Sequence, residues 1–187
     1  MITKFDFSIL RFIQEHMRCV FLDFLMPIIT LFGEYGIWWI SVALLFMMIR
    51  SHRKCGATMA VGLIMCGVIG NILLKNIVGR DRPCWIDKSV GLLINVPHDY
   101  SFPSGHTMLC FTSAVILAFY DKKLGIPALI LSAAVGFSRM YLYVHFPTDV
   151  LAGMLIGIAI GVFSALAMKR FVFERKKALE EKTKVTI

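Results

Sequence analysis

Three short polar stretches of this sequence contain side chains that can bind and transfer an anionic group. They are KNIVGRDRP at residues 75–83, FPSGH at residues 102–106 and SRMYLYVHFPTD at residues 138–149. Their lysine, arginine, histidine and aspartate residues suit the binding of phosphoryl oxygens and the transfer of a proton. Because an unpaired charge is costly in an apolar setting, ionisable groups between apolar runs are expected to have partners and a function.

FPSGH predicts the start of a helix. Pro103 favours an extended conformation at Phe102, and Ser104 is a good N-cap. The first turn then presents free N–H groups around Gly105 and His106, which makes a ready anion site. The alternative is that Ser104 only caps the helix and that His106 only lies at an interface.

KNIVGRDRP is a second source of positive charge, because it contains Lys75 and, seven residues later, Arg82. Gly79 and Pro83 predict that the helix carrying Lys75 ends between the two cations. A basic residue at a helix C-terminus also satisfies terminal carbonyls, and an arginine can extend to lipid headgroups. Taken alone, this stretch favours a role in membrane topology over a role in catalysis.

The third stretch places Arg139, His145 and Asp149 near the start of the last apolar run. Pro147 suits the first position of a helix, so Asp149 falls in the first turn and His145 just before it. A first-turn carboxylate can reach back and accept an N–H from the His145 ring, which would fix the tautomer and expose the other nitrogen. Alternatively, Asp149 caps its own helix and His145 is an interfacial aromatic residue.

The rest of the chain has the composition of a membrane protein. Of its 187 residues, 58% are hydrophobic and 17% are charged, and the mean hydropathy is +0.74. A helix needs about 20 apolar residues to cross a bilayer, so the sequence predicts an all-α membrane protein with a six-transmembrane-helix bundle. The predicted helices are residues 18–33, 36–50, 55–78, 104–120, 124–143 and 147–169.

Two terminal segments flank this bundle, which occupies residues 18–170. Residues 1–17 contain apolar and polar groups at helical spacing and predict a short amphipathic helix on the membrane surface. Residues 171–187 form a basic cytoplasmic tail. Within the last predicted helix, Gly153, Gly157 and Gly161 recur every four residues, which favours close packing against a neighbouring helix.

The positions of the charged residues predict the orientation in the membrane. The chain has 20 Lys and Arg against 12 Asp and Glu, a net charge of +8. A six-helix arrangement places 15 of the 20 basic residues on one side. By the positive-inside rule, both termini are then cytoplasmic and the three polar stretches face outside. Membrane lipid is therefore an expected partner and nucleic acid is not. The five cysteines lack metal-binding spacing and predict no metal site.

In their order along the chain, the three stretches read Lys-x6-Arg-Pro, Pro-Ser-Gly-His and Ser-Arg-x5-His-x3-Asp. This pattern resembles the three-part signature of the type 2 phosphatidic acid phosphatase superfamily. That family includes membrane lipid phosphatases, glucose-6-phosphatase-like enzymes and soluble vanadium haloperoxidases. All signature positions match, and the resemblance covers roughly residues 55–169. The apolar helices exclude a soluble haloperoxidase-like enzyme.

The resemblance implies a phosphate-binding site made of five residues. Lys75, Arg82 and Arg139 would hold the phosphoryl oxygens. The Ser104 hydroxyl and the Gly105 N–H would add hydrogen bonds. Because the cations would neutralise the phosphoryl charge, neither a metal nor another cofactor is expected.

The resemblance also implies three catalytic residues. His145 would be the nucleophile and form a phosphohistidine, while Asp149 would orient it. His106 would protonate the leaving oxygen and then activate the water that hydrolyses the intermediate.

The expected activity is a lipid phosphatase of the bacterial plasma membrane. A small chain with an outward-facing site resembles members that act on undecaprenyl diphosphate, a carrier lipid of cell wall biogenesis. Phosphatidylglycerophosphate and phosphatidic acid are the alternative substrates. The loop at residues 84–101 is the candidate lid for the headgroup, although its residues Trp85 and Tyr100 are equally typical of interfacial aromatics.

Two other functions are weighed against this one. A transporter would spread charged groups through the depth of several helices, whereas here they concentrate at one end. A catalytically silent lipid-binding member of the same fold would not need His145, His106 and Asp149 intact. The sequence leaves open whether the protein forms a homodimer.

Overall fold

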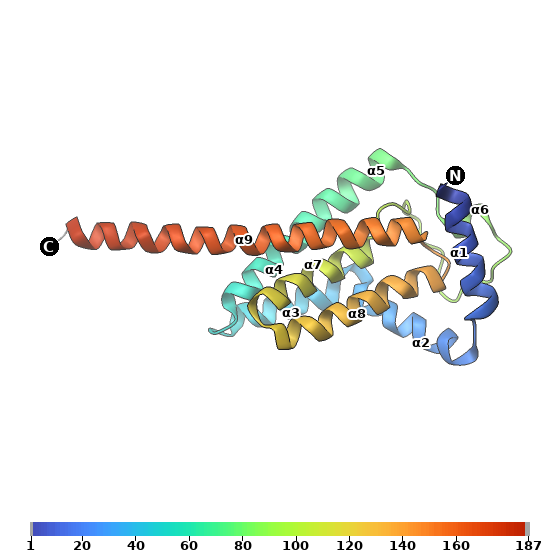
Figure 1. Cartoon of the computed structure of the whole chain (residues 1–187), viewed down its shortest axis with the longest axis horizontal. Helices are drawn as coiled ribbons and strands as arrows, with labels where there is room; N and C mark the ends of the chain where they lie inside the picture. Colours follow the sequence, from blue (N-terminus) through green and yellow to red (C-terminus); the bar gives the residue numbers. More distant parts are fainter. Residues whose placement is uncertain (1, 186–187) are drawn as a thin grey trace.

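The computed structural model describes the backbone of residues 2–185 and the side chains of residues 4–172. Every regular element in this part of the chain is a helix. In chain order these are α1 (Ile2–His16), α2 (Val20–Thr30), η1 (Leu31–Gly36), α3 (Ile37–Met48), α4 (Arg53–Cys66), η2 (Gly67–Leu74), α5 (Lys75–Val78), α6 (Pro83–Ile86), α7 (Gly105–Tyr120), α8 (Lys122–Tyr141) and α9 (Pro147–Val185). Figure 1 shows the long helices running along one axis, with α1 lying across one end of the bundle.

Four helical segments are long and apolar enough to cross a membrane, and a fifth is apolar but shorter. The four are Val20–Met48, Arg53–Ile86, Lys122–Tyr141 and Pro147–Val172, and the fifth is α7. These segments expose large apolar side chains, among them Phe24, Ile64, Ile130 and Leu155. Such a surface is stable in lipid, where helices satisfy their own backbone hydrogen bonds. The protein is an integral membrane protein, and the prediction of an all-helical fold is confirmed.

The prediction of six separate membrane helices does not match the structure. Predicted helices 18–33 and 36–50 are the two halves of one kinked segment, Val20–Met48. Helix α2 has 11 residues and extends for only about 16 Å, roughly half of a hydrocarbon core. Helix α3 has 12 residues, so neither helix is long enough to cross alone. The bundle contains five apolar segments within the described residues.

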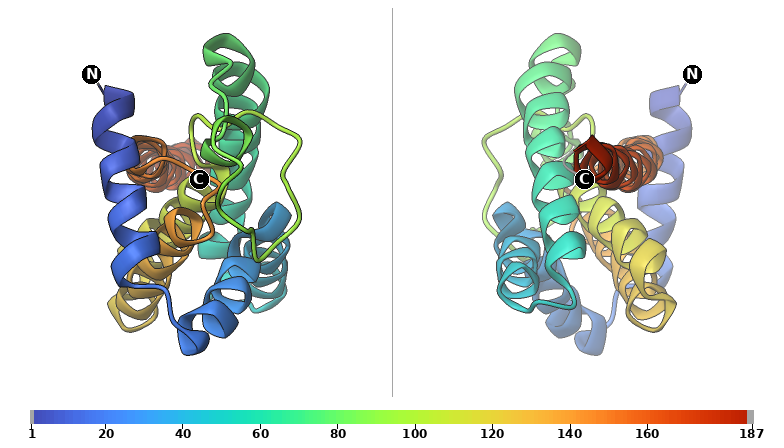
Figure 2. Two further views of the ribbon diagram at one scale, coloured as in Figure 1. Left: turned by 90° about the vertical axis from the view of Figure 1, so that its right-hand side faces the viewer. Right: turned by 90° about the vertical axis from the view of Figure 1, so that its left-hand side faces the viewer.

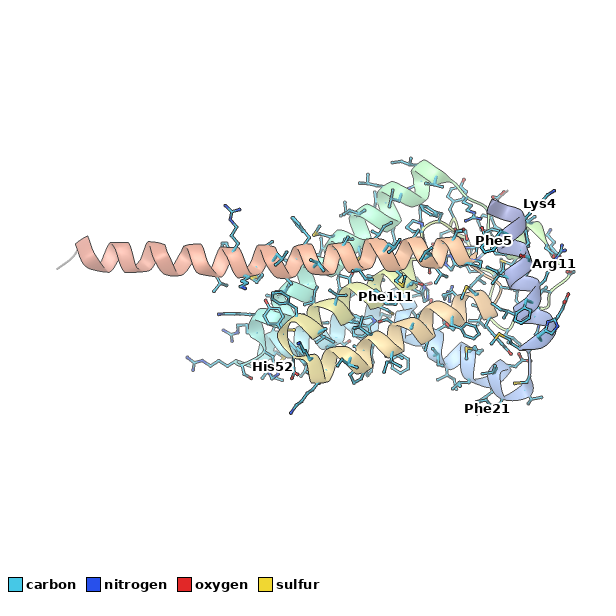
Figure 3. All side chains as sticks on the ribbon, viewed as in Figure 1. Lys4, Phe5, Arg11, Phe21, His52 and Phe111 are labelled. Carbon is cyan, nitrogen blue, oxygen red and sulfur yellow. The ribbon has the colours of Figure 1, made fainter. Side chains whose placement is uncertain are left out.

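With one crossing fewer, the two described ends of the chain lie at opposite ends of the bundle (Figures 1 and 2). Helix α1 lies where α9 begins, whereas α9 extends far beyond the other end. This arrangement does not support the prediction that both termini share one side, which stays a prediction. Figure 3 shows Lys4 and Arg11 at one end of the bundle and His52 at the other.

Helix α1 packs its apolar face on the bundle end. Leu10 and Ile13 are fully or almost fully buried and belong to one core cluster with Leu142 and Phe146, which precede α9. Phe5 lies on the exposed face of α1. The helix predicted within residues 1–17 is therefore present, while its contact with a membrane surface stays a prediction.

The glycine repeat of α9 lets this helix approach α7 closely. A Cβ atom would lie 2.6 Å from Ser104 O at Gly153 and 2.5 Å from Met108 O at Gly157. The Thr112 hydroxyl of α7 also donates a hydrogen bond to Gly157 O, at 2.9 Å. The predicted close packing is confirmed, and it fixes the start of α9 beside the start of α7.

Replacing Gly157 with valine should therefore destabilise the bundle. Its side chain would overlap the backbone of α7, and overpacking of this kind costs about 2 kcal/mol. We expect a lower midpoint of thermal unfolding in detergent. Ala159→Val is the matched control, because Ala159 is exposed on the same helix and should unfold like the unchanged protein. Equal midpoints for both variants would contradict the packing argument.

Candidate active site

The fold brings all three polar stretches to the end of the bundle where α1 lies. Arg82 Nη1 lies 3.1 Å from His145 Nε2, and Ser104 N–H donates to Asp149 O at 3.1 Å. A Cβ atom at Gly105 would lie 3.9 Å from Lys75 Nζ. Residues separated by up to 74 positions in the sequence thus share one site.

Local backbone features place the two cations of KNIVGRDRP. The π-helical turns of η2 come directly before Lys75, and such turns occur often at functional sites. Gly79 ends α5 in the left-handed conformation, with φ of 56°, which glycine adopts without strain. Pro83 then occupies the first turn of α6. The predicted break between Lys75 and Arg82 is confirmed.

His145 lies in the connection between α8 and α9 and is almost completely buried. Val144 N–H and His145 N–H both donate to Arg139 O, at 3.2 and 3.3 Å, and this turn holds the residue in place. An arginine N–H can only donate a hydrogen bond, so its contact with Nε2 makes that nitrogen the acceptor. The proton of the neutral ring is then on Nδ1.

Burial, together with the charges of Arg82 and Arg139, holds the pKa of His145 well below its ordinary value of 6.5. The imidazole is therefore neutral at physiological pH. Its Nε2 lone pair lies beside cations, which is the environment of a nucleophile that attacks an anionic group.

Asp149 lies behind His145, but the contact differs in detail from the predicted one. Its Oδ2 lies 3.8 Å from His145 Nδ1, which is too long for a direct hydrogen bond. The Ser101 hydroxyl lies between them, donating to Asp149 Oδ2 at 2.5 Å and lying 3.4 Å from Nδ1. Phe146 N–H also donates to Asp149 Oδ2, at 2.9 Å, so the predicted reach of this carboxylate toward the entering chain is confirmed.

Lys75 and Arg82 share one carboxylate, that of Asp99. Lys75 Nζ donates to Asp99 Oδ2, and Arg82 Nη2 donates to Asp99 Oδ1 at 2.7 Å. Burial alone would raise the pKa of Asp99, but the hydrogen bond from Lys75 and the charge of Arg82 outweigh it and lower that pKa well below 3.8. The carboxylate is thus ionised and bridges two of the predicted phosphate-binding cations.

Arg139, the third predicted cation, is buried near the end of α8. Its Nη1 donates to the Thr30 hydroxyl at 2.6 Å. Its Nε is buried and has no hydrogen-bond partner among the described residues. A buried donor of this kind is rare and needs an explanation, and an anion bound at the site would provide one.

FPSGH forms the start of α7, as predicted. Ser104 is the N-cap, although its side chain does not bond a backbone N–H. Its hydroxyl is hydrogen-bonded to Thr107 Oγ1 at 2.9 Å instead. His106, in the first turn, has Nε2 3.0 Å from Glu34 Oε2.

The sequence did not assign a role to Asp6 or Arg80, which form a buried network behind Asp149. Arg80 Nη2 donates to Asp6 Oδ2 at 2.6 Å, and Arg80 Nη1 donates to Asp149 Oδ1 at 2.5 Å. The side chains of both aspartates are completely buried. Thr148 joins the network through its N–H and its hydroxyl, which both donate to Asp6. This network attaches α1 to the candidate site.

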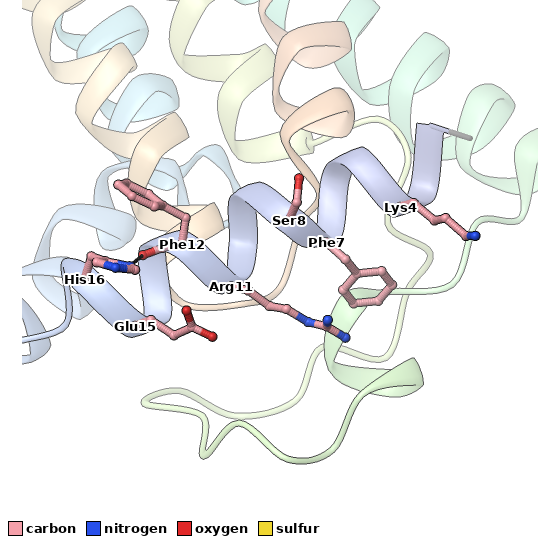
Figure 4. A pocket seen from close by; sticks show the side chains of 7 residues that line it. All are labelled: Lys4, Phe7, Ser8, Arg11, Phe12, Glu15 and His16. Carbon is pink, nitrogen blue, oxygen red and sulfur yellow. Dashed lines mark hydrogen bonds between the residues drawn. The ribbon is translucent and has the colours of Figure 1, made fainter.

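A depression of about 720 Å³ lies along α1, and all its lining residues come from that helix (Figure 4). None of the predicted site residues lines it. The polar cluster around His145 is therefore separate from this surface.

The bundle thus places a buried imidazole near the charges of Arg82, Arg139 and Lys75, an arrangement that suits an anionic phosphoryl group. A model of the PAP2 superfamily matches residues 55–173, which include all three polar stretches. The chain belongs to the PAP2 superfamily.

Two related proteins and one solved structure are similar to the chain. The undecaprenyl-diphosphatase of Sulfolobus acidocaldarius is 34% identical over 144 residues, covering 76% of this chain and 69% of that protein. The undecaprenyl-diphosphatase BcrC of Bacillus subtilis is 32% identical over 149 residues, covering 75% of this chain and 72% of that protein. The crystal structure of Aquifex aeolicus LpxE has a TM-score of 0.74 at 28% identity, covering 84% of this chain and 93% of that one. These likenesses support a membrane lipid phosphatase.

Proposed function

We propose that this protein hydrolyses a phosphate or diphosphate monoester on a lipid headgroup, without a metal, through a phosphohistidine at His145. The observation that carries the proposal is the setting of that ring. It is buried, its Nε2 is 3.1 Å from Arg82 Nη1, and its Nδ1 faces the Ser101–Asp149 pair. A neutral, oriented imidazole next to cations is suited to attack an anionic phosphorus centre.

The substrate binds through the three cations. Lys75, Arg82 and Arg139 hold the non-bridging oxygens. The Nε of Arg139, which has no hydrogen-bond partner in the described part of the chain, supports this role. The Ser104 hydroxyl and Gly105 N–H add hydrogen bonds at the start of α7. Because the cations neutralise the phosphoryl charge, no metal is required for the transfer.

Two balanced steps follow. His145 Nε2 forms a bond to phosphorus while the bond from phosphorus to the leaving oxygen breaks, and His106 gives that oxygen a proton. Water then attacks the phosphohistidine, the P–N bond breaks, and His106 takes the proton from the water. With a lipid diphosphate, the products are inorganic phosphate and the lipid monophosphate. Asp149 stabilises the positive charge on the His145 ring during the transfer.

Undecaprenyl diphosphate is the proposed substrate, since the two similar proteins described above are undecaprenyl-diphosphatases. The site lies at the end of the apolar bundle, so a headgroup can enter while its tail remains in lipid. The loop at residues 84–101 is the proposed headgroup lid. Its Asp99 must release or share Lys75 and Arg82 when the phosphoryl group binds.

The proposed orientation places the site on the outer face of a bacterial plasma membrane. The loops at the opposite end of the bundle carry basic residues, which favour the cytoplasmic side. They are Arg50, Arg53, Lys54, Lys122 and Lys123. The basic residues of α1 lie at the site end, so the charge asymmetry is smaller than the six-helix prediction implied.

Phosphate release from a panel of lipids tests the activity. The purified protein in detergent is incubated with undecaprenyl diphosphate, phosphatidylglycerophosphate and phosphatidic acid, each with and without a chelator. We expect release from undecaprenyl diphosphate to be fastest and to be unchanged by the chelator. A requirement for a divalent ion would contradict the mechanism. Faster release from either glycerolipid would contradict the substrate.

A further inference from the structure

We infer that Glu34 is a positioning residue for His106. Its carboxylate holds the His106 ring at Nε2, which leaves Nδ1 to give a proton to the leaving oxygen and to take one from water. This inference rests on the proposed function. Glu34 lies outside all three polar stretches, and 72 residues separate it from His106. Its carboxylate nevertheless lies 3.0 Å from the His106 ring.

The kink in the first apolar segment brings Glu34 to this place. Glu34 leaves the helical conformation with ψ of 117°, and Tyr35 has φ of 47°. Gly36 also has a positive φ, of 70°, and it starts α3. Such angles are strained for tyrosine and are tolerated where the surrounding structure requires them. The kink thus places the Glu34 carboxylate beside His106, in the first turn of α7.

The same kink makes room for the His106 ring. A Cβ atom at Gly33 would lie 2.8 Å from His106 Cδ2 and 2.9 Å from His106 Cβ. Any larger residue would displace the ring from Glu34. The sequence Gly33-Glu34 therefore supplies both the space for the imidazole and the carboxylate that bonds it.

This contact divides the work of the two ring nitrogens. Nε2–H donates to Glu34, and this bond is kept throughout the reaction. Nδ1–H of the charged ring then passes its proton to the leaving oxygen as the P–O bond breaks. The neutral Nδ1 later takes one proton from the attacking water as the new O–P bond forms. Before the leaving oxygen is protonated, the Glu34 carboxylate stabilises the charged His106 ring. Before the water attacks, it fixes the tautomer of the neutral ring.

The exposure of the two side chains suits this arrangement. His106 is 18% exposed and Glu34 is 39% exposed, so water reaches the carboxylate more easily than the ring. Asp149 and Ser101 have the corresponding position behind His145. The candidate site therefore contains two histidines, each oriented by a carboxylate, one for attack and one for proton transfer.

A series of substrates with different leaving groups tests this inference. The value of kcat/KM is measured for Glu34→Gln with an alkyl phosphate, phenyl phosphate and 4-nitrophenyl phosphate. An alkoxide needs a proton as it leaves, whereas 4-nitrophenolate does not. We expect about a tenfold loss with the alkyl phosphate and less than a twofold loss with 4-nitrophenyl phosphate, given that general acids contribute about a hundredfold or more. Because kcat/KM reports the first phosphoryl transfer, slow hydrolysis of the phosphohistidine does not mask the difference.

The comparison is made within each protein preparation, so a smaller folded fraction lowers all three values equally. Glu15→Gln is the matched control, since Glu15 is an exposed carboxylate of α1, and it should behave like the unchanged protein. Glu34→Asp should recover part of the alkyl phosphate activity. An equal loss on all three substrates, or no loss, would overturn the role of Glu34 alone. Unchanged protein that releases phosphate neither from these compounds nor from undecaprenyl diphosphate would overturn the proposed function and this inference together.

Discussion

Replacing His145 with alanine is expected to reduce phosphate release from a lipid diphosphate by about a thousandfold or more, because the proposed mechanism forms the phosphoryl intermediate on this residue. The neighbouring cations remain in the variant, so substrate binding should change much less than kcat. Phosphate release in detergent, with a chelator present, measures the loss. A parallel experiment with a radiolabelled terminal phosphate should yield an acid-labile, base-stable phosphoprotein from the unchanged protein only.

His52→Ala is the control for this variant. His52 lies at the other end of the bundle (Figure 3) and contacts Ser51 and Phe46. Its removal should leave both turnover and the labelled intermediate unchanged. If His145→Ala still forms the labelled protein, then another residue is the nucleophile and the proposed mechanism is wrong.

The residues that meet at the site could be predicted from the sequence because they lie at helix ends. The residue types that start or end a helix are recognisable within a few neighbouring positions. Ser104 occupies the N-cap position of α7, Gly79 ends α5 and Pro147 begins α9, at the positions that their residue types favour. Helix ends of alternate segments lie at the same end of a bundle. Two long helices, α7 and α8, lie between Arg82 and His145, as predicted. The chain therefore returns to the same end of the bundle, where the two residues meet.

The residues that were missed depend on contacts across long sequence separations. Glu34 reaches His106 only because the chain breaks at Gly33–Gly36, and the sequence pattern there was interpreted as a connection between two membrane helices. Counting that break as a connection between two helices gave six predicted membrane helices, whereas the structure has one kinked segment there. Asp99 lies in the loop predicted as a lid, but its ion pair with Lys75 and Arg82 has no sequence signature.

Asp6 was missed for another reason. An aspartate on an amphipathic surface helix is normally solvated, and nothing in the local pattern indicates that it is completely buried. Its burial is explained by Arg80, which adjoins the signature residue Arg82 but belongs to no signature position. One guanidinium donates to two buried carboxylates and offsets part of their charge, so Arg80 links α1 to the acid behind the candidate nucleophile.

Replacing Arg80 with glutamine should consequently affect both stability and turnover. Asp6 and Asp149 would be left as buried carboxylates without a counter-charge, and loss of one partner of a buried ion pair costs about 3 kcal/mol. Asp149 would also lose the hydrogen bond to its Oδ1, one of those that orient it, so kcat should fall about a hundredfold with a smaller change in KM. Thermal unfolding and phosphate release in detergent measure the two effects. Arg11→Gln, which removes an exposed cation of α1, should change neither.

A second substitution separates the two roles of Arg80. In the double variant with Asp6→Asn and Arg80→Gln, one of the two uncompensated charges is gone, so part of the lost stability should return. Turnover should not return with it, because Asp149 still lacks the guanidinium that held its Oδ1. Arg80→Lys keeps the positive charge but lacks the planar fork of donors with which arginine bonds both carboxylates. Compared with Arg80→Gln, it should therefore recover more of the stability than of kcat. If the double variant is no more stable than Arg80→Gln alone, Asp6 and Arg80 act independently, and α1 is not coupled to the site through this pair.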